Sequence, residues 1–224
     1  MKEKKEYVLH SKRRVEECWN EKKPYQTFLL GREFTILPKV FSPKYFNDTL
    51  LFAKNLPQLR GKSVLEIGSG SGVLSLFSIW KGAKNVMAID INPEAVKNTK
   101  LNIERHGLYG RINSKKSNLF DSINSKFDVI LWNYPFVHVS KKRLSLKERA
   151  VFDHNYNSLK KFASSAKNFL NKEGFILVGF SSTMGDVKEL KKIMNQNGFN
   201  QSLLFKEKPR KIYFELFKFT RRKF

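Results

Sequence analysis

The chain contains little cysteine and no long hydrophobic segment. Cys18 is its one cysteine in 224 residues, which excludes an internal disulfide and a cysteine-ligated zinc site. The longest apolar run, Val73 to Trp80, is far shorter than the ~18 residues of a membrane span. The charged start, Met1 to Lys5, lacks the apolar core of a secretory signal. The four histidines follow no metal-ligand spacing. We therefore predict a cytoplasmic protein without a metal or a membrane partner.

Acidic residues are also scarce. The sequence has 20 Asp and Glu against 43 Lys and Arg, which gives a formal net charge of +23. Such an excess predicts a polyanionic partner, and nucleic acid is the usual one. A general enrichment in lysine and asparagine, as in proteins from AT-rich genomes, is the alternative explanation. The composition favours RNA or the ribosome as a partner.

A glycine-rich turn follows an apolar segment. Residues 64–72 read Val-Leu-Glu-Ile-Gly-Ser-Gly-Ser-Gly, and an amphipathic run begins at Val73. The pattern predicts a buried strand, a tight turn and a helix whose N-terminus faces a ligand. Glycine suits the turn because it tolerates positive φ and lets a ligand approach bare backbone. The dinucleotide fingerprint requires a small residue at position 73, where this chain has valine.

A second apolar segment, residues 86–90, ends in Asp90 about 22 residues after Gly68. A carboxylate at this place can accept hydrogen bonds from both hydroxyls of a ribose. The spacing Glu-x-Gly-x-Gly-x-Gly, followed by this acid, resembles motif I of the class I S-adenosylmethionine (SAM) methyltransferases; a glycine turn without a ligand is the alternative. The resemblance implies SAM as cofactor, bound by Glu66, Gly68, Ser69, Gly70, Gly72, Asp90, Ile91, Asn118, Leu119 and Asn133.

Two of these residues come from the segment after the third predicted strand. Asn118 lies where the family often has aspartate, so its amide oxygen would accept from the adenine amino group. Leu119 would supply a backbone N–H to the adenine ring. A turn-forming asparagine without a ligand is the alternative for Asn118.

The tetrapeptide Asn133-Tyr134-Pro135-Phe136 follows the predicted strand 127–132, at the sheet edge where open α/β folds bind ligands. It is similar to the Asn-Pro-Pro-Tyr/Phe motif of amino-methyltransferases, which include release-factor glutamine, ribosomal-RNA guanine-N2 and adenine-N6 enzymes. The resemblance implies methyl transfer to a planar amino group, with these four residues as the catalytic set.

Each position of the tetrapeptide has a chemical reason. The Asn133 amide oxygen and the carbonyl of Tyr134 can each accept one N–H of the target amino group. Pro135 favours an extended conformation of the residue before it, and Phe136 offers a flat face for stacking. Tyr134 departs from the family, which usually has proline there. Its side chain would either stack on the target or reshape the pocket, and an ordinary strand-ending turn is the alternative.

The order of predicted elements indicates an α/β fold with a doubly wound, Rossmann-like seven-stranded sheet whose last strand is antiparallel. The predicted strands are 63–67, 86–90, 111–115, 127–132, 175–180, 201–205 and 212–219. The predicted helices are 48–56, 71–81, 93–106, 155–171 and 186–197, and a turn at Gly174 is expected before the strand 175–180. We expect residues 1–60 to form a basic arm, a hairpin over 27–37 and a capping segment, and residues 61–224 to form the methyltransferase domain.

The role of residues 1–26 is open. A short helix is expected around Arg13 to Trp19, and the segment fits a disordered arm, a capping helix or an RNA-binding tail. Thr49 is a candidate substrate contact. Lys141, Lys142 and Arg143, in a basic loop after the tetrapeptide, are candidate contacts for RNA phosphates.

Three functions remain open from sequence. The first is an N-methyltransferase that acts on a base amino group of RNA, which the charge and the stacking residues favour. The second is a protein methyltransferase that acts on a glutamine or similar amide of a translation factor or ribosomal protein. The third is a non-catalytic RNA-binding module that binds SAM. The retention of Asn133 and Phe136 argues against the third.

Overall fold

A computed structural model of the chain describes residues 2–139, 141, 143–209 and 211–222, with side chains from Glu6 onward. Its centre is a seven-stranded sheet in the order β10-β11-β9-β6-β3-β4-β5. The strands are β3 (Ser63–Ile67), β4 (Asn85–Asp90), β5 (Ile112–Lys116), β6 (Phe127–Asn133), β9 (Leu170–Phe180), β10 (Phe199–Glu207) and β11 (Phe214–Arg221). β11 pairs antiparallel with both of its neighbours, and the remaining pairs are parallel. The predicted fold class is confirmed.

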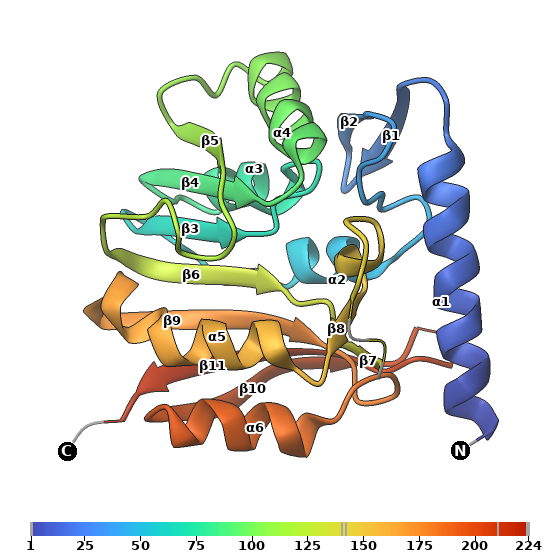
Figure 1. Cartoon of the computed structure of the whole chain (residues 1–224). Helices are drawn as coiled ribbons and strands as arrows, with labels where there is room; N and C mark the ends of the chain where they lie inside the picture. Colours follow the sequence, from blue (N-terminus) through green and yellow to red (C-terminus); the bar gives the residue numbers. More distant parts are fainter. Residues whose placement is uncertain (1, 140, 142, 210, 223–224) are drawn as a thin grey trace.

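Helices cover both faces of the sheet (Figure 1). They are α2 (Asp48–Lys54), α3 (Val73–Trp80), α4 (Pro93–Arg105), α5 (Asn157–Ala166) and α6 (Val187–Gln196). Successive residues of β6 alternate between two core clusters: Val129 and Leu131 pack with α2 and α3, whereas Ile130 and Trp132 pack with α5 and α6. The strand reads as a continuous apolar run because both of its faces are buried.

The predicted hairpin is present as β1 (Tyr25–Leu29) and β2 (Arg32–Ile36). Leu30 and Gly31 both have positive φ, as a two-residue hairpin turn requires. Phe34 and Ile36 are buried in the core cluster that contains α3. The hairpin is therefore part of the packed molecule.

The N-terminal helix is longer than the sequence indicates. α1 runs over Lys2–Asn20 instead of Arg13 to Trp19. Val15 and Cys18 are each 2% exposed, which shows that this helix packs against the rest of the chain. Of the three possibilities for this segment, the structure shows a packed helix. It crosses the side of the molecule toward which the arrowheads of β6 and β9 point (Figure 1).

The region between α5 and β9 differs from the prediction. The expected helix 155–171 is shorter, because α5 ends at Ala166 and a 3-10 turn spans Lys167–Phe169. β9 then begins at Leu170, whereas the sequence predicts a turn at Gly174. A Cβ at Gly174 would lie 2.9 Å from the Asp128 carbonyl oxygen. This glycine thus permits close strand contact at an irregularity in the β6–β9 register.

Two short strands are absent from the prediction. β7 (Val137–Val139) and β8 (Phe152–His154) pair in parallel and enclose the basic loop, with a 3-10 turn at Glu148–Ala150 between them. Val137, Val151 and Phe152 share a third core cluster with Val15 of α1. None of the described helices is both long enough and apolar enough to cross a membrane.

Candidate active site

A cavity of about 820 Å³ lies where the parallel strands end. The structure brings nearly all of the predicted site residues to its lining. These are Thr49, Glu66, Gly68, Ser69, Gly70, Asp90, Ile91, Asn118, Leu119, Asn133, Tyr134, Pro135 and Phe136. Gly72, Lys141 and Arg143 are not part of the lining, and Lys142 lies outside the described residues.

The glycine turn presents bare backbone to the cavity. Gly68 and Gly70 have φ values of 70° and 55°, in the left-handed region that favours glycine. A Cβ at Gly68 would come no nearer than 3.8 Å to Trp132, and one at Gly70 no nearer than 3.9 Å to Phe41. Space at these two positions is therefore open for a ligand that lies against the main chain.

Gly72 has a different role in this geometry. A Cβ there would lie 3.0 Å from the Thr99 side chain of α4, and its φ is 83°. The residue allows α3 to start close against α4, outside the cavity. Its expected contact with the cofactor stays a prediction.

Asp90 is held by backbone donors on both of its oxygens. Gly70 N–H donates to Oδ2 at 2.9 Å, and Asn92 N–H donates to Oδ1 at 2.8 Å. Burial raises the pKa of this carboxyl, although these two hydrogen bonds and the charge of Arg149 oppose the rise. Each oxygen keeps further acceptor capacity, so the carboxylate can still bind two ribose hydroxyls.

Glu66 is buried at the end of β3 and accepts a hydrogen bond from the Ser75 hydroxyl. Burial raises the pKa of its carboxyl to about 8, and the nearby Asp90 contributes to the rise. The side chain is therefore mostly neutral at pH 7. It lines the cavity as a protonated carboxyl rather than as a fixed negative charge.

Asn118 already has protein partners for both ends of its amide. Arg149 donates to its Oδ1 at 3.1 Å, and its Nδ2 donates to Asp121 at 3.3 Å. The oxygen expected to face an adenine amino group is thus shared with Arg149, which the prediction does not include. The next residue, Leu119, has a φ of 51°, which is unusual for leucine and marks a constrained backbone at the cavity wall.

The amide of Asn133 is oriented by Asp48. Its Nδ2 donates to Asp48 Oδ2 at 2.9 Å and lies 3.5 Å from the Thr49 hydroxyl. Its Oδ1 is buried and accepts no hydrogen bond from the described residues. The amide nitrogen is therefore engaged, and the amide oxygen is left as an acceptor without a donor.

Gly179 of β9 escapes the sequence prediction, because it reads as an ordinary residue of a strand. It pairs with Asn133 across the β6–β9 ladder. A Cβ at this position would lie 2.8 Å from Asn133 Oδ1 and 3.0 Å from the Phe52 ring. Glycine here provides the space that the Asn133 amide occupies.

We expect Gly179→Ala to displace the Asn133 amide and to lower turnover at least ~10-fold, with a loss of stability on the order of 1–3 kcal/mol from overpacking. Steady-state kinetics and thermal unfolding measure the two effects. Gly174→Ala is the control, because a Cβ there would also be too close to its neighbours, 2.9 Å from the Asp128 carbonyl oxygen, but Asn133 is not among them. Full turnover in the Gly179 variant would show that the amide does not need this space.

The side chain of Tyr134 is directed into the protein interior. It is 1% exposed, donates from its hydroxyl to Asp153 at 2.8 Å and stacks on Phe180 with ring centroids 5.9 Å apart. Asp153 also accepts from Ser158 at the start of α5. Tyr134 therefore does not stack on a target. Its buried side chain fixes the tetrapeptide where the family relies on a second proline.

Phe136 closes the tetrapeptide with its ring packed against Phe180 and Phe214, at centroid distances of 5.9 and 6.2 Å. It remains part of the cavity lining, as the prediction of a stacking face requires. The described residues contain no cluster of three or more His, Cys, Asp or Glu side chains that could hold a metal ion.

The sequence prediction also omits the contribution of α1. Glu6, Tyr7, His10, Ser11, Arg14 and Trp19 all line the cavity. Tyr7, Ser11 and Arg14 follow a spacing of four and three residues, which places them on one face of a helix. That spacing is visible in the sequence, but nothing there indicates what the face meets.

The doubly wound sheet with its antiparallel strand, the glycine turn and the acid at the end of β4 define a class I SAM-dependent methyltransferase. Residues 31–203 match the Methyltransferase small domain family, and the chain belongs to that family. It is 34% identical over 167 residues to a protein of Methanocaldococcus jannaschii named "Putative protein N5-glutamine methyltransferase", with 73% of this chain and 83% of that protein covered.

Two further proteins are similar to this chain, one in sequence and one in fold. Ribosomal RNA small subunit methyltransferase C of Psychromonas ingrahamii is 32% identical over 155 residues; the match covers 67% of this chain and 44% of that protein. A solved Thermus thermophilus 16S rRNA N2 G1207 methyltransferase, in complex with SAM and guanosine, superposes with a TM-score of 0.67 at 21% identity. That superposition covers 90% of this chain and 50% of that one, and it supports the fold.

SAM is the cofactor, and the residues of the cavity fit it. The open backbone at Gly68 and Gly70 and the remaining acceptor capacity of Asp90 suit a nucleoside. When bound, SAM supplies an electrophilic methyl group on a sulfonium. The chain's own part is to hold the acceptor nitrogen in line with that methyl group and to exclude water.

Proposed function

We propose that this methyltransferase transfers the methyl group of SAM to the exocyclic amino group of an RNA base. The observation that carries the proposal is the Asn133 amide, whose nitrogen is engaged by Asp48 while its oxygen has no partner among the described residues. An amino group is the complement of such an acceptor. The cytoplasmic location predicted from sequence is part of this proposal.

The roles within the tetrapeptide follow from what a planar amino group requires. The nitrogen lone pair is delocalised into the ring, so it attacks poorly until the nitrogen becomes pyramidal. The Asn133 amide oxygen and the Tyr134 carbonyl accept one N–H each and favour that form. SAM, when bound, would supply the methyl group and would leave as S-adenosylhomocysteine, and the methylated nitrogen would release one proton to bulk solvent. Phe136 supplies a face for the base plane.

The charges around the cavity support RNA as the acceptor. Lys44, Arg149 and Lys211 belong to its lining and come from three separate segments. The acidic residues Glu6, Asp48, Glu66 and Asp90 also line it, and burial raises the pKa of the last three carboxyls. The positively charged side chains around the cavity would attract a phosphodiester chain, and this attraction favours nucleic acid over a neutral peptide as the substrate.

The direct test supplies SAM with a tritiated methyl group to the protein, in separate reactions with hypomethylated RNA and with ribosomal protein. We expect label in RNA, and in a single nucleoside after digestion. The second candidate is methylation of a protein glutamine, which the name of the Methanocaldococcus relative favours. Label confined to protein would establish that candidate and remove the RNA proposal.

A salt titration tests the basic loop. Neutralising Lys141 and Arg143 to glutamine should weaken RNA binding and lower the slope of log affinity against log salt by about 0.7 for each phosphate that the variant no longer binds. Lys141 is paired with Glu148 at 2.7 Å, so Arg143 is expected to dominate.

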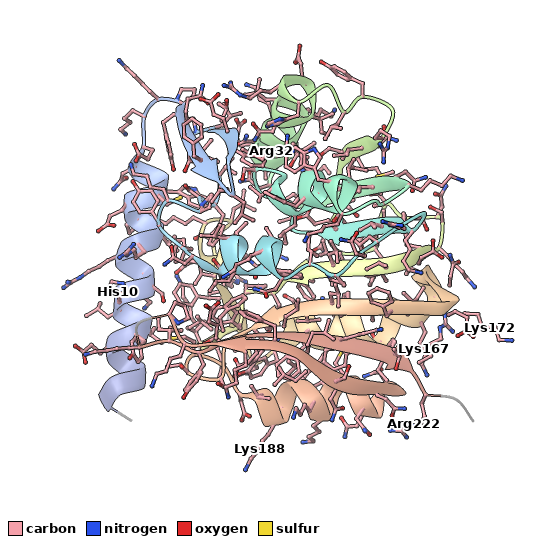
Figure 2. All side chains as sticks on the ribbon, turned by 180° about the vertical axis from the view of Figure 1, so that it is seen from behind. His10, Arg32, Lys167, Lys172, Lys188 and Arg222 are labelled. Carbon is pink, nitrogen blue, oxygen red and sulfur yellow. The ribbon has the colours of Figure 1, made fainter. Side chains whose placement is uncertain are left out.

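The control for this titration is the double variant Lys172→Gln and Arg222→Gln. It removes the same charges from the opposite end of the molecule (Figure 2). Equal slopes for the two double variants would show that the loop does not contact phosphates.

A further inference from the structure

Part of the cavity lining comes from a segment that precedes the family match. The Methyltransferase small domain covers residues 31–203, whereas α1 ends at Asn20. Yet α1 lines the same cavity as the glycine turn and Asn133. The matched region therefore supplies the cofactor cradle and the tetrapeptide, and α1 adds a wall from outside that region.

α1 is fixed in place by contacts with both sides of the cavity mouth. Cys18 Sγ donates to the Val40 carbonyl at 3.1 Å, on the segment that leads to α2. Val15 packs in one cluster with Val137 and Phe152 of the β7–β8 pair. Lys147, in the loop between those strands, pairs with Glu16 at 2.5 Å. These contacts attach the helix to two other segments, so α1 forms a wall of the cavity and can hold a side chain at a defined place.

Arg14 is the positively charged residue on the cavity face of this wall, which also carries Glu6. Its Nη1 donates to the Tyr45 carbonyl at 3.0 Å, three residues before Asp48, which orients Asn133. No described carboxylate forms an ion pair with it. A guanidinium has five N–H donors, so most of those of Arg14 are available to a ligand. Its planar fork matches a phosphate in a bidentate arrangement.

We propose that α1 reads the RNA next to the methyl-accepting base, with Arg14 binding a flanking phosphate and Tyr7 and His10 contacting the nucleotide attached to it. This role of α1 rests on the proposed function, and its contact with the neighbouring nucleotide would make the enzyme selective among RNA sites. An aromatic ring and two nitrogen-rich side chains on one helix face suit a nucleotide, which offers a base to stack and a phosphate to bind. The acceptor of the methyl group is still held by Asn133.

The test compares two neighbouring arginines. Arg14→Gln removes the charge from the cavity wall and retains an amide donor for the Tyr45 carbonyl. Arg13→Gln removes the same charge from an exposed position of α1 that does not line the cavity. We expect Arg14→Gln to raise the KM for RNA about 10-fold or more, as the removal of one charged hydrogen bond predicts, with kcat within twofold of the original.

Two further measurements separate binding from a structural role. The Kd for SAM and the thermal midpoint of Arg14→Gln should equal those of Arg13→Gln. The salt slope for RNA should be lower than that of Arg13→Gln by about 0.7, the value for one phosphate. Arg14→Lys retains the charge without the planar fork and should restore only part of the affinity.

The outcomes distinguish the proposed role of α1 from the proposed methylation of RNA. If the original protein methylates RNA and both glutamine variants have the same KM, the role of α1 is overturned and the proposed function stands. A parallel loss of SAM affinity and thermal stability in Arg14→Gln would also overturn it, because the arginine would then act only through the Tyr45 segment. Methylation of protein in place of RNA overturns both claims.

Discussion

Replacing Asn133 with alanine is expected to lower turnover by ~10²-fold or more while the affinity for SAM changes little. The substitution removes one of the two acceptors that hold the target nitrogen, and groups that act on the reacting centre have effects of this size. The cofactor cradle around Gly68 and Asp90 is not altered. Single-turnover rates with labelled SAM, together with calorimetric titration of SAM, measure the two quantities.

The same substitution leaves Asp48 without its donor, so a control must separate that effect. Asn171→Ala breaks a comparable hydrogen bond, because Asn171 Nδ2 donates to Asp128 at 2.7 Å outside the cavity. We expect it to lower stability without changing turnover. If Asn133→Ala turned over as fast as Asn171→Ala, the tetrapeptide would have no part in the chemistry.

The fold can be predicted because its signals are local. The apolar strands, the glycine turn and Asp90 are each read from a few neighbouring residues, and their order implies a doubly wound sheet. The hairpin over 27–37 is visible for the same reason, although its turn lies at Leu30-Gly31. The prediction at Gly174 is wrong because a glycine that ends a helix and one that permits close strand contact look alike in sequence.

The sequence underestimates α1 because the buried face of this helix is sparse. Val15 and Cys18 are separated by charged residues, and their partners Val137 and Val40 lie far along the chain. A helix of this kind is stabilised by packing that a local pattern does not contain. Its contribution to the cavity could not be predicted for the same reason.

The sequence identifies site residues where a motif carries the chemistry, but it does not identify their partners. The prediction places Asn133 and Asn118 at the cavity, but not Asp48 or Arg149, which bind their amides from 85 and 31 residues away. The direction of the Tyr134 side chain likewise depends on Asp153, in a strand that the sequence does not reveal. Long-range partners decide how a motif residue is oriented.

Glu66→Gln is expected to change how stability depends on pH. Burial raises the pKa of Glu66 in the folded protein to about 8, above the 4.5 of an unperturbed side chain. The folded state therefore binds a proton that the unfolded state has lost between these two values. Relative to the glutamine variant, the stability of the original protein is complete below pH 4.5 and declines as pH rises to about 8.

The size of this loss of stability follows from the difference between the pKa of Glu66 in the folded and in the unfolded protein. The loss approaches about 1.4 kcal/mol for each pH unit, which gives a total on the order of 5 kcal/mol above pH 8. Chemical denaturation at pH 5, 7 and 9 measures it, with Glu17→Gln as an exposed control on α1. The stability difference between the Glu66 variant and the original protein should be smallest at pH 5 and grow at pH 7 and pH 9, whereas the control should show no such trend. A constant difference across the three pH values would mean that Glu66 is ionised in the folded protein at neutral pH.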